Sequence, residues 1–213
     1  KPAITSAIPE VVAAERAWTA ASRERDPRAA LAAWEEAAMA FDVAVAKAGP
    51  SRNEAAYAAM LAWKYAVADP TLGPPAYRTS FAHPTPLTAR ELGLVRALSV
   101  YLPLASPAEL PDLLFSRARV FYAHGKLDEA LPSFVEILSK HPESEVASDA
   151  ANLLLDALNE QGKYDLVADW VDKLRANPKL LGKRAVFAQH LDELHVQVLR
   201  KRAEKYQVAG ATT

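Results

Sequence analysis

The sequence contains no cysteine, which excludes disulfides, thiolate zinc clusters and cysteine nucleophiles together. Long apolar runs are missing as well, and none approaches the ~20 residues that a membrane-spanning helix needs. We therefore expect no membrane span within this chain, and any membrane anchor would lie outside it. A dominant charge is also missing, because the formal net charge is only −1. Without a basic surface field to attract phosphates, nucleic acid is not an expected partner.

Signatures of catalysis and of metal binding are scarce too. The seven glycines stand alone or next to proline or lysine, so the sequence has no glycine-rich phosphate loop. Nucleophile motifs such as GxSxG and SxxK do not occur. His190 and His195 would lie about 140° apart on a helix and cannot share a ligand face. Adjacent acids such as Glu35 and Glu36 fit a solvated helix face. We expect no catalytic residue, no metal, no cofactor and hence no enzyme.

The abundant residues are those that favour helices. Alanine supplies about a fifth of the chain, and leucine, glutamate, lysine and arginine fill much of the rest. Strand signals are nearly absent. The composition therefore predicts an all-α protein, and 213 residues are enough to bury a substantial core.

The clearest pattern is an internal repeat, first seen over residues 111–142. Leu114, Ala118 and Phe121 have the spacing of one face of a helix. Gly125 follows, where a glycine would end that helix in the left-handed region. A second helix carries an apolar stripe and ends before a proline: Ala130, Phe134, Ile137, Leu138 and Pro142. The segment therefore predicts a helical hairpin.

The same pattern recurs 37 residues later, which is the distance from Gly125 to Gly162. Apolar residues lie on one face before and after the second glycine: Ala151, Leu154, Leu155 and Leu158, then Val167, Val171 and Leu174. Pro178 lies close to the expected end of this unit. Two hairpins with matching turn residues indicate a repeat architecture.

This order of small, aromatic, glycine and proline positions resembles the tetratricopeptide repeat, whose usual period is about 34 residues. Here the three extra residues fall in the PESEVASDA stretch after Pro142. The extended repeat resembles those of periplasmic scaffold members of the family, such as the cell-division coordinator of the Tol system and the lipoprotein of the outer-membrane barrel assembly machinery. The run over 122–174 is also similar to myxobacterial repeat proteins, some tied to gliding motility. Arg117 departs from the family's usual leucine, and Val167 from its small alanine.

The resemblance implies an all-α fold, a right-handed α-solenoid of tetratricopeptide-like helical hairpins with a C-terminal capping helix. We expect a single domain over residues 1–213. Its expected parts are a degenerate N-terminal hairpin over 8–50, with helices near 8–22 and 28–48; a hairpin over 53–104 with a Pro-rich loop, 69–86, inserted after a helix over 53–68; hairpins over 108–142 and 144–178; and a capping helix over 183–207.

Local start and stop signals support these bounds. Asp26 and Pro27 are typical of the start of a helix. Thr88 and Glu91 have the spacing of a capping box, so helix resumes after the five prolines of residues 69–86. The capping helix is expected to be amphipathic, with these apolar residues: Val186, Leu191, Leu194 and Val198.

In the tetratricopeptide family, the first helices of successive repeats line a groove that binds peptides. By register, the resemblance carries this role onto Trp63, Phe115, Arg119, Tyr122, Asn152, Asp156 and Asn159. Aromatic and arginine side chains anchor interfaces, so we expect a ligand with an apolar and an acidic element. Asp156 and Asp149 speak against the carboxylate clamp of chaperone-binding members. Each residue could instead solvate the groove or pack against a neighbour.

Two further segments are weaker candidates. The loop 69–86 could bind a partner, because long insertions are often functional, or could only cover exposed core. Its candidate side chains are Tyr77, Arg78, Phe81 and His83. The basic run 200–205 fits a helix C-terminus whose dipole it complements, and docking to an acidic surface would need a larger patch.

Taken together, these patterns predict a non-catalytic scaffold that binds a protein or peptide within a multiprotein assembly. The resemblance to envelope members favours the periplasm or cell envelope of a bacterium. The alternative is a regulatory or co-chaperone module in the cytoplasm. A secretion leader or lipid-attachment signal in the full gene would separate the two.

Overall fold

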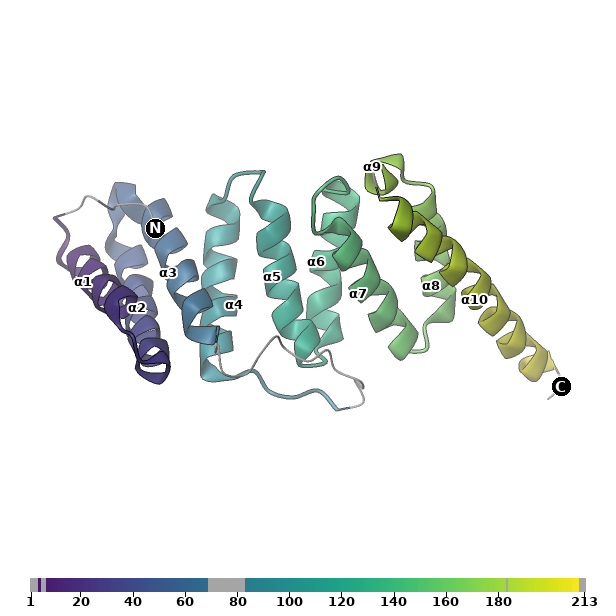
Figure 1. Cartoon of the computed structure of the whole chain (residues 1–213), viewed down its shortest axis with the longest axis horizontal. Coiled ribbons are helices and arrows are strands. Elements are labelled where there is room, and N and C mark those ends of the chain that lie inside the picture. The colour runs from purple at the N-terminus through teal and green to yellow at the C-terminus, as the bar shows by residue number, and fades with distance from the viewer. Residues whose placement is uncertain (1–3, 5–6, 69–82, 183, 211–213) are drawn as a thin grey trace. The chain divides into compact units, whose positions relative to one another are not determined.

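A computed structural model describes residues 4, 7–68, 83–182 and 184–210, with side chains described as far as residue 201. In these ranges the chain forms ten α-helices, two short 3₁₀ turns and no strand (Figure 1). This confirms the all-α class. No helix in the described part is both long enough and apolar enough to cross a membrane.

The chain divides into two compact units, and the division falls inside α5, between Leu113 and Leu114. The first unit comprises Lys1–Arg78 and Thr85–Leu113, and the second Thr79–Pro84 and Leu114–Thr213. The helices of the first unit are α1 (Pro9–Arg23), α2 (Pro27–Lys47), α3 (Arg52–Val67) and α4 (Ala89–Tyr101). Those that follow are α5 (Leu110–Ala123), α6 (Leu127–Lys140), α7 (Ala147–Glu160), α8 (Tyr164–Arg175), α9 (Pro178–Leu181) and α10 (Ala185–Gly210).

Helix starts follow the signals in the sequence. The Asp26 carboxylate accepts a hydrogen bond from the Ala29 amide at 2.8 Å, and Pro27 occupies the first position of α2. At α4, Thr88 and Glu91 make both bonds of the capping box. These local contacts satisfy backbone amides that have no partner within the helix.

The two glycine turns have the same geometry. Gly125 and Gly162 adopt φ values of 68° and 65°, a region that side chains with a Cβ rarely enter. In both turns the glycine amide donates to the carbonyl three residues earlier, and the next residue donates to the carbonyl five residues earlier, at 2.9–3.0 Å. This pair of bonds is the Schellman motif. The predicted helix ends at both glycines are confirmed.

The core of the second unit includes Phe134, which is 0 % exposed, and Leu155, which is also buried. The Phe134 ring lies 6.1 Å from that of Phe115 and 6.2 Å from that of Tyr122, between centroids. Arg117, where the resemblance noted in the sequence implies a leucine, donates to the buried Ser133 hydroxyl at 3.0 Å. A polar pair between α5 and α6 thus takes the place of an apolar contact.

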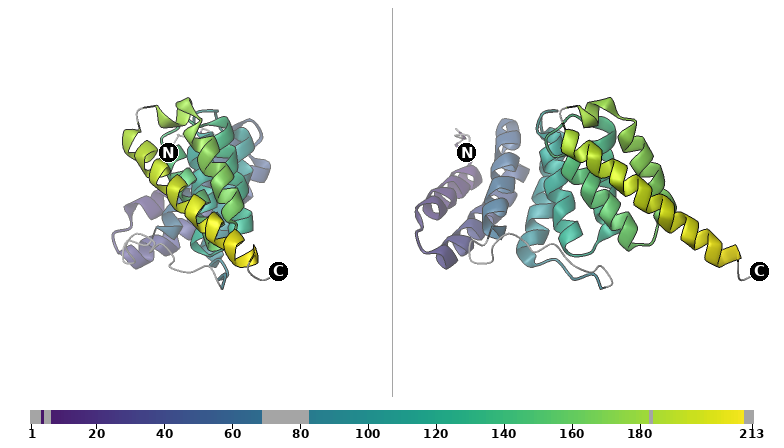
Figure 2. Two further views of the ribbon diagram at one scale, coloured as in Figure 1. Left: turned by 90° about the vertical axis from the view of Figure 1, so that its right-hand side faces the viewer. Right: turned by 45° about the vertical axis from the view of Figure 1, so that its right-hand side comes forward.

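The C-terminal part differs from expectation in two details. A short helix, α9, begins at Pro178, where the Asn177 side chain caps two backbone amides. The long helix α10 lies against α8 and continues past the end of α8 (Figures 1 and 2). Val186 is 85 % exposed, so its expected place on the apolar side of the capping helix is wrong. Phe187 takes that place, because the buried residues of α10 follow the spacing Phe187, Leu191, Val198.

Candidate functional site

Trp63 lies in the first unit and is only 3 % exposed. Its indole N–H donates to the Asp42 carboxylate at 3.0 Å, and the Arg96 guanidinium lies 5.9 Å from the ring centroid. Gly93 of α4 lies so close that a Cβ there would be 2.6 Å from the ring. Trp63 is therefore a packing residue between α2, α3 and α4, with little surface left for a ligand.

Phe115 and Arg119 lie one turn apart on α5, in the second unit. The Arg119 guanidinium stands 5.7 Å from the Phe115 ring centroid, within the range of a cation–π contact. Arg119 is exposed, and among the described residues no carboxylate pairs with it. Stacking on a ring holds the cation in place and leaves its hydrogen-bond donors available.

Tyr122 follows on α5 and is 4 % exposed. Its hydroxyl donates to the carboxylate of Asp156 on α7, and this contact joins the two helices. Most of the phenol is thus part of the core, while Asp156 remains exposed to solvent. The sequence pattern assigned both residues to the binding groove but did not indicate that they bond to each other.

The remaining two candidates lie on α7 with Asp156, at a spacing of four and then three residues. Asn152 is exposed, and its side chain makes no hydrogen bond in the described part of the chain. The Asn159 side-chain oxygen accepts a hydrogen bond from Lys201 of α10 at 3.2 Å. The Lys201 ammonium also lies 5.3 Å from the Tyr164 ring centroid. The α7 stripe therefore presents amide and carboxylate groups next to α10.

Six of the seven candidate residues belong to the second unit, and Trp63 belongs to the first. Of the loop candidates, Tyr77, Arg78 and Phe81 lie outside the described residues. His83 is exposed. We call the surface formed by α5 and α7 of the second unit the α5–α7 face; it includes Phe115, Arg119, Tyr122, Asn152, Asp156 and Asn159.

A pocket of about 490 Å³ adjoins this face at the start of α10. We call it the α7–α10 pocket; it is lined by Ser148, Asn152, Arg184, Ala185, Val186, Phe187 and His190. Arg184 donates to four main-chain carbonyls, at 2.5–3.4 Å, of Leu180 and of the turn before α7, residues 142–144. Sequence analysis did not identify Arg184, because three of its four partners are main-chain carbonyls about forty residues away, which carry no signal in the sequence.

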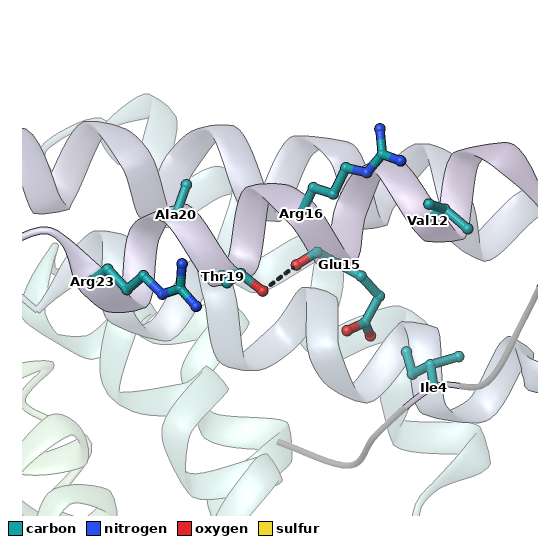
Figure 3. A pocket seen from close by; sticks show the side chains of 7 residues that line it. All are labelled: Ile4, Val12, Glu15, Arg16, Thr19, Ala20 and Arg23. Carbon is teal, nitrogen blue, oxygen red and sulfur yellow. Dashed lines mark hydrogen bonds between the residues drawn. The ribbon is translucent and has the colours of Figure 1, made fainter.

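A second pocket, of about 520 Å³, runs along α1 in the first unit (Figure 3). Arg16 and Arg23 of α1 line it, with Thr19 between them and Ile4 at one side. The Thr19 hydroxyl donates to the Glu15 main-chain carbonyl at 2.8 Å. Ile4 is flanked on both sides by residues outside the described part of the chain.

Shifted pKa values occur at structural contacts of the first unit. Burial, followed by a hydrogen bond to Glu109, raises the pKa of Tyr101 to about 12. Hydrogen bonds from the Ser106 side chain and backbone, opposed by burial, lower the pKa of Glu109. A hydrogen bond from Lys47 lowers the pKa of Glu10. These contacts hold the ends of helices together.

Comparison of the chain with known protein families, with curated proteins and with solved structures gave no match. The likeness of the chain to the tetratricopeptide repeat is therefore a likeness of residue pattern alone.

Proposed function

We propose that this chain is a right-handed α-solenoid of tetratricopeptide-like hairpins and serves as a non-catalytic scaffold that binds a protein or peptide. The α5–α7 face of the second unit is its binding surface. The observation that carries the proposal is the exposed Arg119 guanidinium, stacked on Phe115 and lacking a carboxylate partner among the described residues. Such a group is prepared to bind a carboxylate without first breaking an ion pair.

The repeated turns support the solenoid. Gly125 and Gly162 make the same two hydrogen bonds at the same φ, so α5–α6 and α7–α8 end their first helices in the same way. Repeats of this kind bury their apolar faces by stacking, which leaves one face of each first helix open to a partner.

The chemistry of the α5–α7 face supports a peptide ligand. An aromatic ring and an arginine at one side are residue types that anchor interfaces. Exposed amide and carboxylate groups of Asn152 and Asp156 at the other side can pair with backbone amides and carbonyls of an extended chain. Trp63 is buried in the packing of the first unit and is not part of this surface.

We place the scaffold in a multiprotein assembly of the bacterial periplasm or cell envelope, on the resemblance of its extended repeat to envelope members of the family. The alternative, a regulatory or co-chaperone module of the cytoplasm, would bind its partner through the same face.

Affinity capture from the envelope fraction of the native organism tests the proposal. Tagged wild-type protein and the Phe115→Ala, Arg119→Ala double variant are compared by mass spectrometry. Arg28→Ala, an exposed arginine on α2, is the matched control. We expect a partner that the wild type and the control retain and the double variant loses. Equal recovery by all three proteins would rule out the α5–α7 face as the binding surface.

A further inference from the structure

We propose that the α7–α10 pocket binds a carboxylate joined to an apolar group. This deepens the proposed function and rests on it in one respect, since the natural source of the carboxylate is the bound peptide. The pocket volume, about 490 Å³, falls in the range of pockets that hold small ligands.

The first argument is charge. None of the described residues that line the pocket is acidic. Arg184 is held by four carbonyl oxygens, which carry no net charge, and within the described residues no carboxylate forms an ion pair with it. The wall of the pocket therefore contains a fixed, half-buried positive charge that lacks a counter-ion. A nearby anion is favoured more strongly there than at an open surface, because partial burial reduces screening by water.

The second argument is the supply of hydrogen-bond donors. Asn152 and His190 are exposed at the pocket, one on α7 and one on α10. Neither side chain makes a hydrogen bond or ion pair in the described part of the chain. The Asn152 amide and the His190 ring can each donate to a carboxylate oxygen, whereas the Arg184 Nη atoms are already occupied by the carbonyls. Arg184 thus supplies charge, and the other two supply direct contacts.

The third argument is the apolar wall. Val186 is 85 % exposed, and Phe187 beside it lines the same pocket. An apolar group attached to the carboxylate can cover part of this surface and gain from its burial. The pocket therefore fits either a C-terminal residue with an apolar side chain or an acidic side chain next to an apolar residue.

Three N-acetylated dipeptides test the proposal against ¹⁵N-labelled full-length protein by NMR titration. Acetyl-Ala-Phe carries a free C-terminal carboxylate, and acetyl-Glu-Phe amide carries a side-chain carboxylate. Acetyl-Gln-Phe amide is the neutral counterpart of the second. We expect shifts of the backbone amides of residues 185–190 and of the Asn152 side-chain amide. At least one charged dipeptide should bind at least about fivefold more tightly than the neutral one. The tighter of the two charged dipeptides shows whether the carboxylate comes from a C-terminus or from an acidic side chain.

Variants assign the effect to the pocket. Asn152→Leu together with His190→Leu removes the donors while keeping an apolar wall, and it should abolish the preference for the charged dipeptides. Gln197→Leu, at an exposed position of α10 outside the lining, is the matched control and should retain it. Arg184 is left unchanged because its loss would free the carbonyls that it holds.

Equal binding of charged and neutral dipeptides, or shifts confined to other helices, would overturn the proposal. An Arg119→Ala variant separates it from the proposed function. This variant should lose the captured partner and still bind the dipeptides at the α7–α10 pocket.

Discussion

Replacement of Gly93 by alanine should destabilise the protein, although the substitution favours a helix. In an exposed helix, Gly→Ala stabilises by about 0.5–1 kcal/mol. Here the added Cβ would lie 2.6 Å from three atoms of the Trp63 ring. The ring is buried and held by its bond to Asp42, so it has little room to move. Overpacking costs about 1–3 kcal/mol, and we expect a net loss of about 1–2 kcal/mol.

Urea unfolding of Gly93→Ala measures this loss, with Ser99→Ala at an exposed position of the same helix as the control. A double-mutant cycle with Trp63→Phe identifies the cause. All three crowded atoms belong to the six-membered part of the indole, so the smaller ring should make Gly93→Ala less costly. Stabilisation by Gly93→Ala, or an equal cost in both backgrounds, would refute the role of this close approach.

Three further predictions concern packing and pH. Phe134→Ala should lower the free energy of unfolding by about 3–5 kcal/mol, because the Phe134 ring is fully buried among α5 and α6 side chains. A loss below about 1 kcal/mol in a denaturant titration would contradict this packing. Tyr122→Phe should lower the free energy of unfolding by about 0.5–1.5 kcal/mol, because it removes the hydrogen bond to Asp156. Tyr122→Ala should lower it clearly more, because it also removes the buried ring. Thermal unfolding measures both losses, and equal losses would mean that the ring is not packed. The pKa of Tyr101 is raised to about 12 in the folded protein, against 10.0 in the unfolded chain. This difference stabilises the folded state below pH 10, and the stabilisation is lost as the pH rises towards 12. Unfolding curves recorded against pH should show this alkaline loss in the wild type and not in Tyr101→Phe.

The sequence was most informative where structure is determined by neighbouring residues. Helix starts and ends depend on hydrogen bonds to backbone groups only a few positions away. The structure has these bonds at the starts marked by Asp26 and Thr88 and at the ends marked by Gly125 and Gly162. Apolar periodicity likewise identified Phe134 as a core residue.

Prediction was weaker where the partner is distant in the chain. The Trp63 indole bonds to Asp42, twenty-one residues earlier, and Arg184 bonds to carbonyls forty or more residues earlier. No local pattern indicates such contacts. In α10, a shift of one residue, or 100° around the helix, exchanges Val186 for Phe187 on the buried side. Both positions carry apolar residues, so periodicity alone did not decide which of the two is buried.

The most direct test of the central claim is site-specific photo-crosslinking in the native organism. A photoreactive amino acid is placed at Ser116, three residues before Arg119 on α5, or at Asn152 on α7, so that Arg119 itself is kept, and at Asp169, an exposed position of α8 outside the α5–α7 face. We predict that the same partner is crosslinked from the first two positions and not from the third. Crosslinking from Asp169 alone, or equally from all three positions, would contradict the account.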